Sequence, residues 1–242
     1  MSKLVWDQIG EREYQTGISN GVVYPQVNGT YPKGAAWNGL TSVSETPSGA
    51  DANKIYADNI NYLTMISAEE LGLTIEAYMY PDEFAKCDGT AMEDGLIIGQ
   101  QTRQAFGLCY KTIVGNDEKG NDYGYKLHLI YGCKASPSDQ QFQTVNDSPE
   151  AITFSWTVDT TPVVLSSKDP VTNMVYKPTA RIILDSTKFA DKSKLTAFEA
   201  ILYGTDASGS GQDATPGTDA RLPMPDDVIA FFRGNSNIVE GE

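Results

Sequence analysis

Histidine, cysteine and positive charge are all scarce in this chain of 242 residues. Its three cysteines, Cys87, Cys109 and Cys133, are too widely spaced for a Cys-x-x-Cys metal or redox motif. Their odd number argues against a disulfide framework, so we expect three reduced, partly buried thiols. No run of 18 apolar residues occurs, and the N-terminus lacks the apolar stretch of a signal peptide. We therefore expect a chain that neither spans a membrane nor is exported by a signal peptide.

The charge balance is strongly acidic. Lys and Arg total 18 against 32 Asp and Glu, which gives a net charge of −14. Proteins bind nucleic-acid phosphates largely by supplying cations that displace counterions. A chain with this deficit of cations is expected to repel nucleic acid, and an acidic surface also keeps a protein dispersed.

Sequence motifs for catalysis and nucleotide binding are missing as well. The chain has no GxSxG, HExxH or GxxxxGK[ST], and no GxGxxG follows a predicted strand. The single histidine, His128, lies inside the strand pattern KLHLIYG, where a structural role is expected. The acidic stretch NDEKGND departs from EF-hand spacing. We expect solvated acidic loops, with no catalytic residue, no cofactor and no metal ion.

Alternating apolar and polar residues predict a mainly β protein. The clearest alternation runs over residues 71–80, where Leu73, Ile75 and Met79 share one face and Glu76 lies on the other. A strand with one apolar face and one mixed polar face is typical of an antiparallel sheet with a solvated side.

Two long hairpins are expected, over residues 54–80 and 104–135. In the first, residues 67–70 are either the turn or a bulge within a longer hairpin. In the second, residues 115–124 are rich in turn formers and predict a ten-residue acidic loop. Further predicted elements are strands near 152–158 and 180–185, a short helix over 81–89 and a C-terminal helix beginning at 191 or 193 and ending at Gly204.

Long, ordered blocks of the sequence resemble the major tail proteins of siphophages that infect Gram-positive bacteria. They are GVVYPQVNGTYPKGAAWNGL (21–40), KIYADNINYLTMISAEELGLTIEAYMYPDEFAKCDG (54–89), QTRQAFGLCYKTIVGND with YGYKLHLIYGCKASPSD (101–139), and NDSPEAITFSWTVDTTPV (146–163). The resemblance implies a mainly β fold, an antiparallel β-sandwich or partial barrel of the tail-tube type with a flanking short helix and one C-terminal helix. It also implies three segments: an N-terminal arm with the first strands (1–53), the tail-tube β-domain (54–190), and a C-terminal helix, flexible linker and docking arm (191–242).

The function implied by this resemblance is structural. The chain is expected to self-assemble into stacked hexameric rings, which form the non-contractile tail tube that conducts DNA from capsid to host. Expected partners are further copies of itself, the tape measure protein inside the tube, the tail terminator and the distal tail or tip proteins. DNA is expected to pass without specific binding, and no membrane is involved. The protein is expected in the virion tail, after assembly in the bacterial host cytoplasm.

Three sets of residues are the candidates for these roles. The expected lumen-facing carboxylates are Glu76, Glu69 and Glu70. The expected ring-stacking loop contains Asn116, Asp117, Glu118, Lys119, Asn121 and Asp122. The expected inter-subunit arm contains apolar residues from segments that do not look able to form a core alone, namely Trp37, Leu222, Met224, Val228, Ile229, Phe231 and Phe232.

Two other classes of function stay open at this stage. A carbohydrate-binding or adhesin-type β-sandwich would place exposed aromatic residues on a concave sheet, and the candidates for that are Tyr78, Tyr80, Tyr123 and Tyr125. A hydrolase would use a pair of the clustered carboxylates. Ring or tube formation would favour the tail protein, and a strict monomer would favour the lectin.

Overall fold

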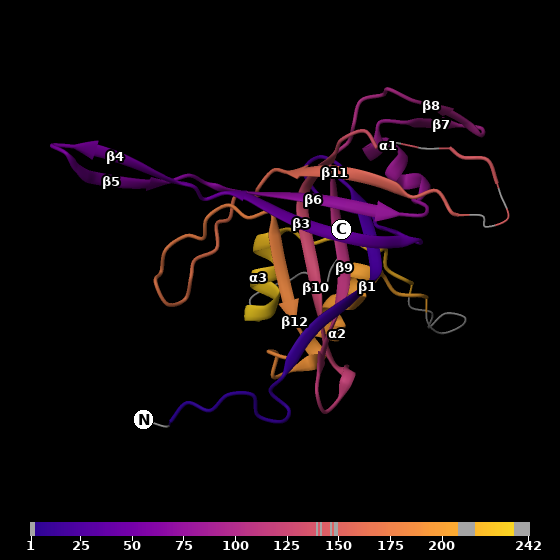
Figure 1. Ribbon diagram of the computed structural model, residues 1–242. Helices are drawn as coiled ribbons and strands as arrows, with labels where there is room; N and C mark the ends of the chain where they lie inside the picture. The colour runs from indigo at the N-terminus through magenta and orange to yellow at the C-terminus, as the bar shows by residue number, and fades with distance from the viewer. Residues whose placement is uncertain are drawn as a thin grey trace.

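A single antiparallel sheet holds most of the chain together (Figure 1). The computed structural model describes residues 3–138, 140, 142–145, 147, 150–207 and 216–234, so half of the predicted flexible linker (205–220) and the end of the predicted docking arm (235–242) lie outside the described residues. In the described residues the sheet has eight strands, in the order β2-β1-β9-β10-β11-β6-β3, with β12 also pairing with β10. The strands are β1 (Glu13–Pro25), β2 (Ala35–Ala36), β3 (Leu40–Gly49), β6 (Glu69–Ala77), β9 (Phe106–Asn116), β10 (Gly120–Ala135), β11 (Phe154–Thr160) and β12 (Arg181–Asp185). The predicted mainly β, antiparallel fold is confirmed.

The sheet folds into two layers because β10 changes partners along its length. Its residues 126–130 pair with β12, and its residues 133–135 pair with β11. Between these stretches lies an irregularity at Gly132, whose φ is +65° and where an added Cβ would come within 2.2 Å of the Thr161 carbonyl oxygen. Such a bulge bends a strand and increases its twist. As a result β11, β6 and β3 cross over the layer formed by β1, β9, β10 and β12 (Figure 1).

Aromatic side chains fill the space between the two layers. The ring of Trp37 lies 4.6 Å from that of Phe84 and 5.8 Å from that of Trp156, between ring centroids. The short segments η1 (Asp82–Phe84) and α1 (Ala85–Asp88) carry Phe84 into this core and end at Gly89, which has a φ of +78°. Aromatic pairs of this kind contribute about 0.5–1.5 kcal/mol each beyond their buried area. The predicted short helix over 81–89 is therefore present, as two consecutive single turns.

A second core lies on the outer face of the β1–β9–β10–β12 layer. It is covered by two helices, α2 (Lys192–Tyr203) and α3 (Pro225–Arg233). Asp191 caps α2 by accepting a hydrogen bond of 2.9 Å from the Ser193 amide, which decides between the two predicted starting residues, 191 and 193. The sequence indicated only a helical turn at Pro225, because a helix of nine residues is marginal until it packs. Here Phe231 and Phe232 pack on Phe198 of α2, so the C-terminal region has two helices and not one.

The first long hairpin is longer than predicted. It begins at β3, continues through β4 (Ala52–Ala57), turns, and returns through β5 (Ile60–Ile66) into β6. Its turn is Asp58–Asn59, where both residues have positive φ, as a two-residue type I′ hairpin turn requires. Residues 67–68 interrupt the ladder, so the bulge alternative is the correct one and the predicted limits of 54–80 are wrong.

The second long hairpin has almost no loop. Strand β9 continues to Asn116 and β10 begins at Gly120, so most of the residues predicted as a ten-residue loop lie within these two strands, with a register shift between Gly120 and Gly124. The composition was misleading because Asn, Asp and Gly are common in turns but here continue the ladder. A small separate hairpin, β7 (Ala91–Glu93) and β8 (Leu96–Ile98), was not predicted.

Candidate assembly surfaces

The outer face of the β11–β6–β3 layer is polar. Glu76 lies between Ser155 of β11 and Ser42 of β3, and the Ser42 hydroxyl donates a 2.9 Å hydrogen bond to its carboxylate. The opposite face of the same strands buries Leu73 and Ile75. The sequence-predicted alternation at Glu76 therefore holds in the structure.

Few charges interrupt this polar face, and almost all of them are negative. The uncharged residues that line this face, opposite one another on neighbouring strands, are Ser42, Ser44, Thr46, Ser48, Gly72, Thr74, Ser155 and Thr157. The same face carries the carboxylates of Glu70, Glu76 and Asp159, and Lys134 of β10 pairs with Asp159. Strands β3, β6 and β11 contain no Lys or Arg. Such a face offers no cluster of cations that would hold a phosphate backbone.

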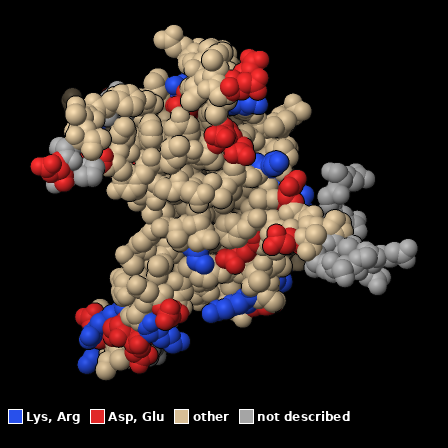
Figure 2. Space-filling model, turned by 90° about the vertical axis from the view of Figure 1, so that its right-hand side faces the viewer, with Lys and Arg blue, Asp and Glu red and all other residues tan. Residues whose placement is uncertain are grey.

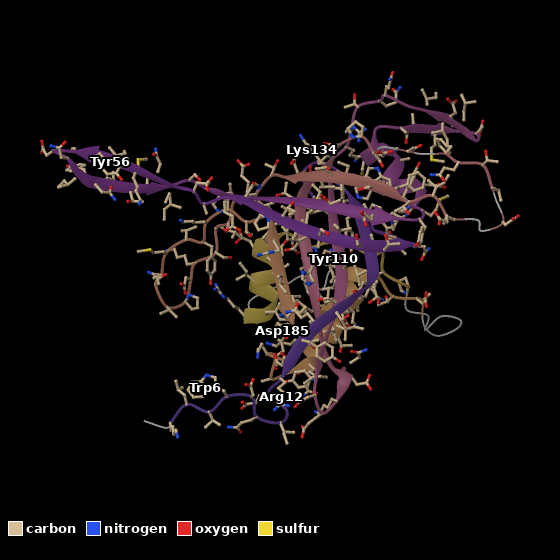
Figure 3. All side chains as sticks on the ribbon, viewed as in Figure 1. Trp6, Arg12, Tyr56, Tyr110, Lys134 and Asp185 are labelled. Atoms are coloured by element: carbon tan, nitrogen blue, oxygen red, sulfur yellow. The ribbon has the colours of Figure 1, made fainter. Side chains whose placement is uncertain are left out.

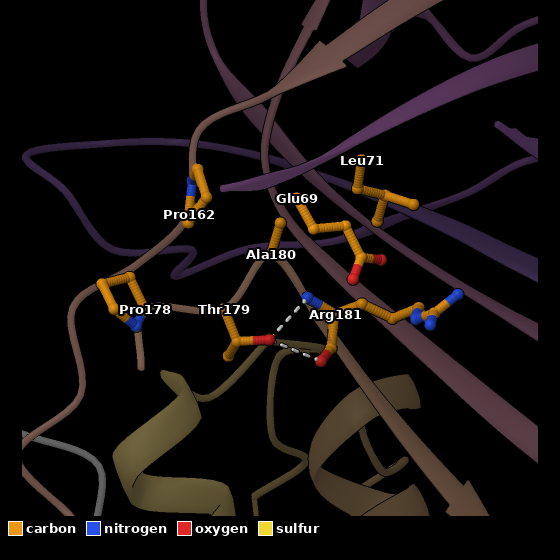
Figure 4. Close-up of a pocket in the computed structure, with 7 residues that line it drawn as sticks. All are labelled: Glu69, Leu71, Pro162, Pro178, Thr179, Ala180 and Arg181. Carbon is orange, nitrogen blue, oxygen red and sulfur yellow. Dashed lines mark hydrogen bonds between the residues drawn. The ribbon is translucent and has the colours of Figure 1, made fainter. Parts of the chain in front are cut away.

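Glu69 does not share this face. Adjacent residues of a strand point to opposite sides of a sheet, and Glu69 lines a pocket of about 260 Å³ with Leu71, Pro162, Pro178, Thr179, Ala180 and Arg181 (Figure 4). Across the pocket the Thr179 hydroxyl bonds the backbone of Arg181, accepting from its amide at 3.2 Å and donating to its carbonyl at 2.9 Å. The three predicted lumen carboxylates are thus divided, with Glu70 and Glu76 on one side and Glu69 on the other.

The β4–β5 hairpin is an apolar extension with no core of its own. Its large apolar side chains are all at least 40% exposed, namely Ile55, Tyr56, Ile60, Tyr62, Leu63, Met65 and Ile66. Its charged residues are Lys54 and Asp58. The hairpin projects well away from the two layers (Figures 1 and 3). An isolated two-stranded hairpin is at best marginally stable in water, and contiguous exposed apolar surface of this kind marks an interaction site.

A second exposed apolar segment lies at the N-terminus. Leu4, Val5, Trp6 and Ile9 are between 61% and 77% exposed, and the segment runs outward from the end of the molecule that carries the β9–β10 turn (Figure 3). None of the predicted site residues lies in this segment. The available signal was four large apolar residues among the first nine, with no repeat of a helix or strand period to explain them.

The base of this N-terminal segment is clamped to the β9–β10 turn. The Gly10 amide donates a 2.9 Å hydrogen bond to the Asp117 carboxylate, and the Asn116 side-chain amide donates one of 3.2 Å to the Gly10 carbonyl. The Arg12 guanidinium lies 4.0 Å from the same Asp117 carboxylate. Charged side chains of both signs gather at one end of the molecule (Figure 2, lower left). These contacts fix the position of residues 10–12, from which the exposed segment extends.

The predicted ring-stacking residues are placed partly in strands. Asn116 is buried and ends β9, while its side-chain oxygen accepts a 2.6 Å hydrogen bond from the Lys119 amide. Asn121 lies in β10, where its side-chain oxygen accepts a 2.9 Å hydrogen bond from the Tyr14 hydroxyl. The turn itself consists of residues 117–119, so only these three of the predicted loop residues lie between the strands, while Asp122 lies within β10.

The predicted inter-subunit arm packs on its own subunit. Trp37 is only 4% exposed, and its indole N–H donates a 3.0 Å hydrogen bond to the Met79 carbonyl. Leu222 and Val228 are each 2% exposed within the second core. Met224, Phe231 and Phe232 are half-buried against the same core, and Ile229 is half-buried on α3. The expectation is corrected: these apolar side chains find their partners through long-range contacts that the local sequence does not reveal.

A polar cluster joins the two layers around Glu45. Its carboxylate accepts a 2.6 Å hydrogen bond from the Tyr110 hydroxyl, lies 3.3 Å from Nδ1 of His128, and is also bound by the Arg181 guanidinium. On the other side of the imidazole, Nε2 of His128 lies 3.0 Å from the Thr112 hydroxyl. The contact with His128 lowers the pKa of Glu45 most; burial opposes it, and the bonds from Tyr110 and Arg181 help to bring it to about 2. His128 thus lies in a cluster of contacts that connects β3 to β9, β10 and β12.

All three cysteines are free and buried, as predicted. Burial raises the pKa of both Cys87 and Cys109 to about 12, and it also raises that of Cys133. Thiols in such surroundings are inert. Among the residues that the structure describes, no group of three His, Cys, Asp or Glu side chains is placed to hold a metal ion. No helix within the described ranges is long and apolar enough to cross a membrane.

The tyrosines considered for sugar stacking do not form one platform. Tyr80 packs edge-on against Phe154 and Trp156 in the inter-layer core, and Tyr78 follows β6 close by. Tyr123 donates a 3.0 Å hydrogen bond to Glu13 near the other end of the molecule. Tyr125 lies on the second core, with Nζ of Lys111 3.7 Å from its ring centroid.

Comparison with known proteins assigns no family. No family model matches the chain, and no curated protein matches it. Among solved structures, it is similar to a chain of an extracellular contractile injection system, the PVC sheath–tube complex in its extended state, with 10% identity, a TM-score of 0.36, and coverage of 69% of this chain and 88% of that one. It is also similar to a chain of the anti-feeding prophage (AFP) baseplate, with 9% identity, a TM-score of 0.34, and coverage of 78% and 100%. Likenesses of this size do not assign a function, so the proposal below is drawn from the surfaces described above.

Proposed function

We propose that this chain is the subunit of a phage-type tail tube, which assembles with copies of itself into stacked rings around a channel for DNA. The observation that carries the proposal is the β4–β5 hairpin, which exposes seven large apolar side chains and, among the described residues, forms a separate two-stranded sheet. Burying a large apolar side chain is worth about 1.5–3 kcal/mol relative to leaving it exposed. Several such residues together offset the roughly 4–15 kcal/mol that association costs.

The open edges of the sheet support association side by side. In the described residues β3 pairs only with β6, and β12 pairs only with β10. Unpaired edges invite another strand and are managed in native proteins by covering or pairing them. A closed ring of copies covers such edges, and repeated head-to-tail contacts close into a ring when the rotation between copies allows it. We propose six copies in each ring, as the family resemblance implies.

The polar face of β11, β6 and β3 is proposed as the channel wall. Its carboxylates, Glu70 and Glu76, together with the lack of Lys and Arg on these strands, would leave passing DNA unbound. Six copies carry a formal charge of 6 × −14 = −84 per ring. DNA carries one negative charge per ~1.7 Å of axis, so an acidic wall repels it and lets it slide.

The finer form of the proposal is a non-contractile siphophage tail. The tube would then enclose a tape measure protein, meet a terminator and tip proteins at its ends, and belong to a virion assembled in the host cytoplasm. The β9–β10 turn at residues 117–119 remains our proposed contact between stacked rings. Glu69 is withdrawn from the proposed wall because it lines the pocket behind β6.

Assembly is tested by negative-stain electron microscopy and sedimentation of the purified chain. We expect rings or tubes from the unmodified protein, and monomers from Ile55→Ser/Leu63→Ser, which removes a cross-strand apolar pair of the hairpin. The matched control is Val164→Ser/Val171→Ser, which removes two exposed apolar residues elsewhere and should leave assembly intact. A strictly monomeric unmodified chain over a wide range of concentration and salt would overturn the proposal.

The channel wall is tested by reversing the charge of Glu76. Glu76→Lys changes a six-membered ring by 6 × 2 = 12 charges and should make tubes retain short DNA in a nuclease-resistant form at low salt. The control is Glu83→Lys, which makes the same change at an exposed position of η1. Equal nuclease-resistant retention by both variants, or by neither, would show that Glu76 does not face the channel.

A further inference from the structure

Two exposed apolar pieces lie at opposite ends of the subunit (Figure 1). One is the N-terminal segment, residues 3–9, beside the β9–β10 turn. The other is the β7–β8 hairpin, whose Leu96, Ile97 and Ile98 are exposed in β8. We infer that residues 3–9 of one copy bind beside β8 of a second copy as a third strand. This inference rests on the proposed tube function and names one contact between its rings.

The β7–β8 hairpin has the properties of an incomplete sheet. Each of its strands has three residues, and among the described residues the two strands pair only with each other. Its turn, Asp94–Gly95, has positive φ at both positions and holds the strands in register. Two strands alone are marginally stable in water, and three or more with an apolar face are needed. A third strand would therefore stabilise this hairpin, and β8 is its more apolar edge.

The N-terminal segment has the properties of the missing strand. Its backbone forms no ladder, while Gly10 and Arg12 are fixed to the β9–β10 turn at Asp117. At ~3.3 Å per residue, seven extended residues span about 23 Å, compared with about 10 Å for the three residues of β8. The segment is thus long enough to cover β8 completely, with Leu4 and Trp6 on one side and Val5 on the other.

Charge favours one direction of docking, with Lys3 near the β7–β8 turn. Lys3 begins the described part of the segment, while Glu93 ends β7 and Asp94 lies in the turn. Exposed ion pairs are worth only about 0–1 kcal/mol, so these charges would select the direction of docking and add little affinity.

The position of the two pieces excludes a contact within one subunit and requires a second copy. The N-terminal segment and the β7–β8 hairpin are different surfaces. Each copy can therefore place its own N-terminal segment beside β8 of one neighbour and bind the segment of another neighbour beside its own β8. Such a contact repeats from copy to copy without limit. The β4–β5 hairpin projects sideways from the line that joins these two ends (Figure 1). This separates the inferred contact along the stack from the proposed contact around the ring.

The contact is tested by disulfide cross-linking between two singly substituted full-length chains. Trp6→Cys protein is mixed with Ile97→Cys protein under assembly conditions and oxidised, since a disulfide forms only when the two Cα atoms come within about 7 Å. The native cysteines are buried and do not compete. The matched control replaces Ile97→Cys by Tyr62→Cys, a position on the β4–β5 hairpin that is at least as exposed. We expect at least tenfold more mixed disulfide dimer with Ile97→Cys than with Tyr62→Cys.

The outcomes separate this inference from the proposed function. Tubes that form without a preference for the Ile97→Cys pair would overturn the inference alone, as would a preference for Tyr62→Cys. Preferential linkage of the Ile97→Cys pair in a chain that never forms rings or tubes would support the inference and overturn the tube. Absence of both linkage and assembly overturns both. As a second readout, Leu4→Ser/Trp6→Ser should leave single rings but shorten stacks at least severalfold; stacks of unchanged length contradict the inference.

Discussion

The inter-layer core and the β4–β5 hairpin are built from similar sequence, yet their side chains end in opposite environments. In the core, Ile75 and Trp156 alternate with polar neighbours and are fully buried. In the hairpin, Ile55 and Leu63 also lie in strands with mixed neighbours and face solvent. The difference lies in whether a second layer packs against the apolar face of the strands. The core strands face a second layer of the same chain, whereas the hairpin extends beyond that layer and its apolar face stays exposed.

This comparison predicts the largest loss of stability in the inter-layer core. Trp156→Ala should cost about 3–5 kcal/mol, because it removes the ring that contacts Trp37 and Phe84 and leaves a cavity. Urea unfolding of the unassembled subunit, followed by circular dichroism, measures the change. Tyr56→Ala in the hairpin is the control and should change stability by less than about 0.5 kcal/mol. Similar losses for both variants would remove the distinction between the two regions.

The second core is expected to come next. Leu222→Ala should cost about 2–4 kcal/mol, since the Leu222 side chain is 2% exposed in the second core and its truncation leaves a cavity. The half-buried Ile229→Ala is the comparison and should cost less. The same urea titration measures both. A Leu222→Ala subunit as stable as the unmodified one would restore the interpretation of this segment as an arm that docks elsewhere.

The polar cluster between the layers should give a smaller, pH-dependent effect. Glu45→Gln is expected to cost about 1–3 kcal/mol at neutral pH, because Tyr110, His128 and Arg181 lose an anionic partner. The pKa of Glu45 is lowered from 4.5 in its ordinary state to about 2 in the fold. Its contribution is therefore full above pH ~4.5 and is lost as the pH falls toward ~2.

Urea unfolding at several pH values measures this contribution. The difference between the unmodified subunit and Glu45→Gln should shrink steadily from pH 5 to pH 2, whereas Glu83→Gln on exposed η1 should show no such trend. A difference that stays constant over this range would mean that the carboxylate charge does not join the layers.

The smallest effect on the isolated subunit is expected in the hairpin itself. Ile55→Ser/Leu63→Ser should change the free energy of unfolding by no more than about 0.5 kcal/mol, because both side chains already contact water. The pair nevertheless should prevent assembly, as stated above. A large loss of stability in the monomer would show that the hairpin packs on its own subunit in solution.

Local sequence patterns predicted the parts of the fold that depend on local physics. Alternation predicted the strand that carries Leu73, Ile75 and Glu76, and capping signals predicted α2 at Asp191. Burial of the three cysteines also followed from residue type. Turn composition failed at residues 115–124, where the residues that usually form loops continue a ladder. A single hairpin was also predicted over 54–80. Local patterns do not reveal that β6, which follows the interruption at residues 67–68, pairs with β3.

The candidate assembly surfaces depended on tertiary structure to a much greater degree. Trp37 and Leu222 look like unpartnered apolar residues in the sequence, and only the meeting of distant segments buries them. Trp6 and Ile55 have the same character and stay exposed, because neither belongs to the two cores of the described chain. The sequence by itself determined an acidic, antiparallel β protein with alternating strands. Tertiary structure decided which apolar residues form its core and which remain exposed, because burial is settled by contacts between residues far apart in the chain.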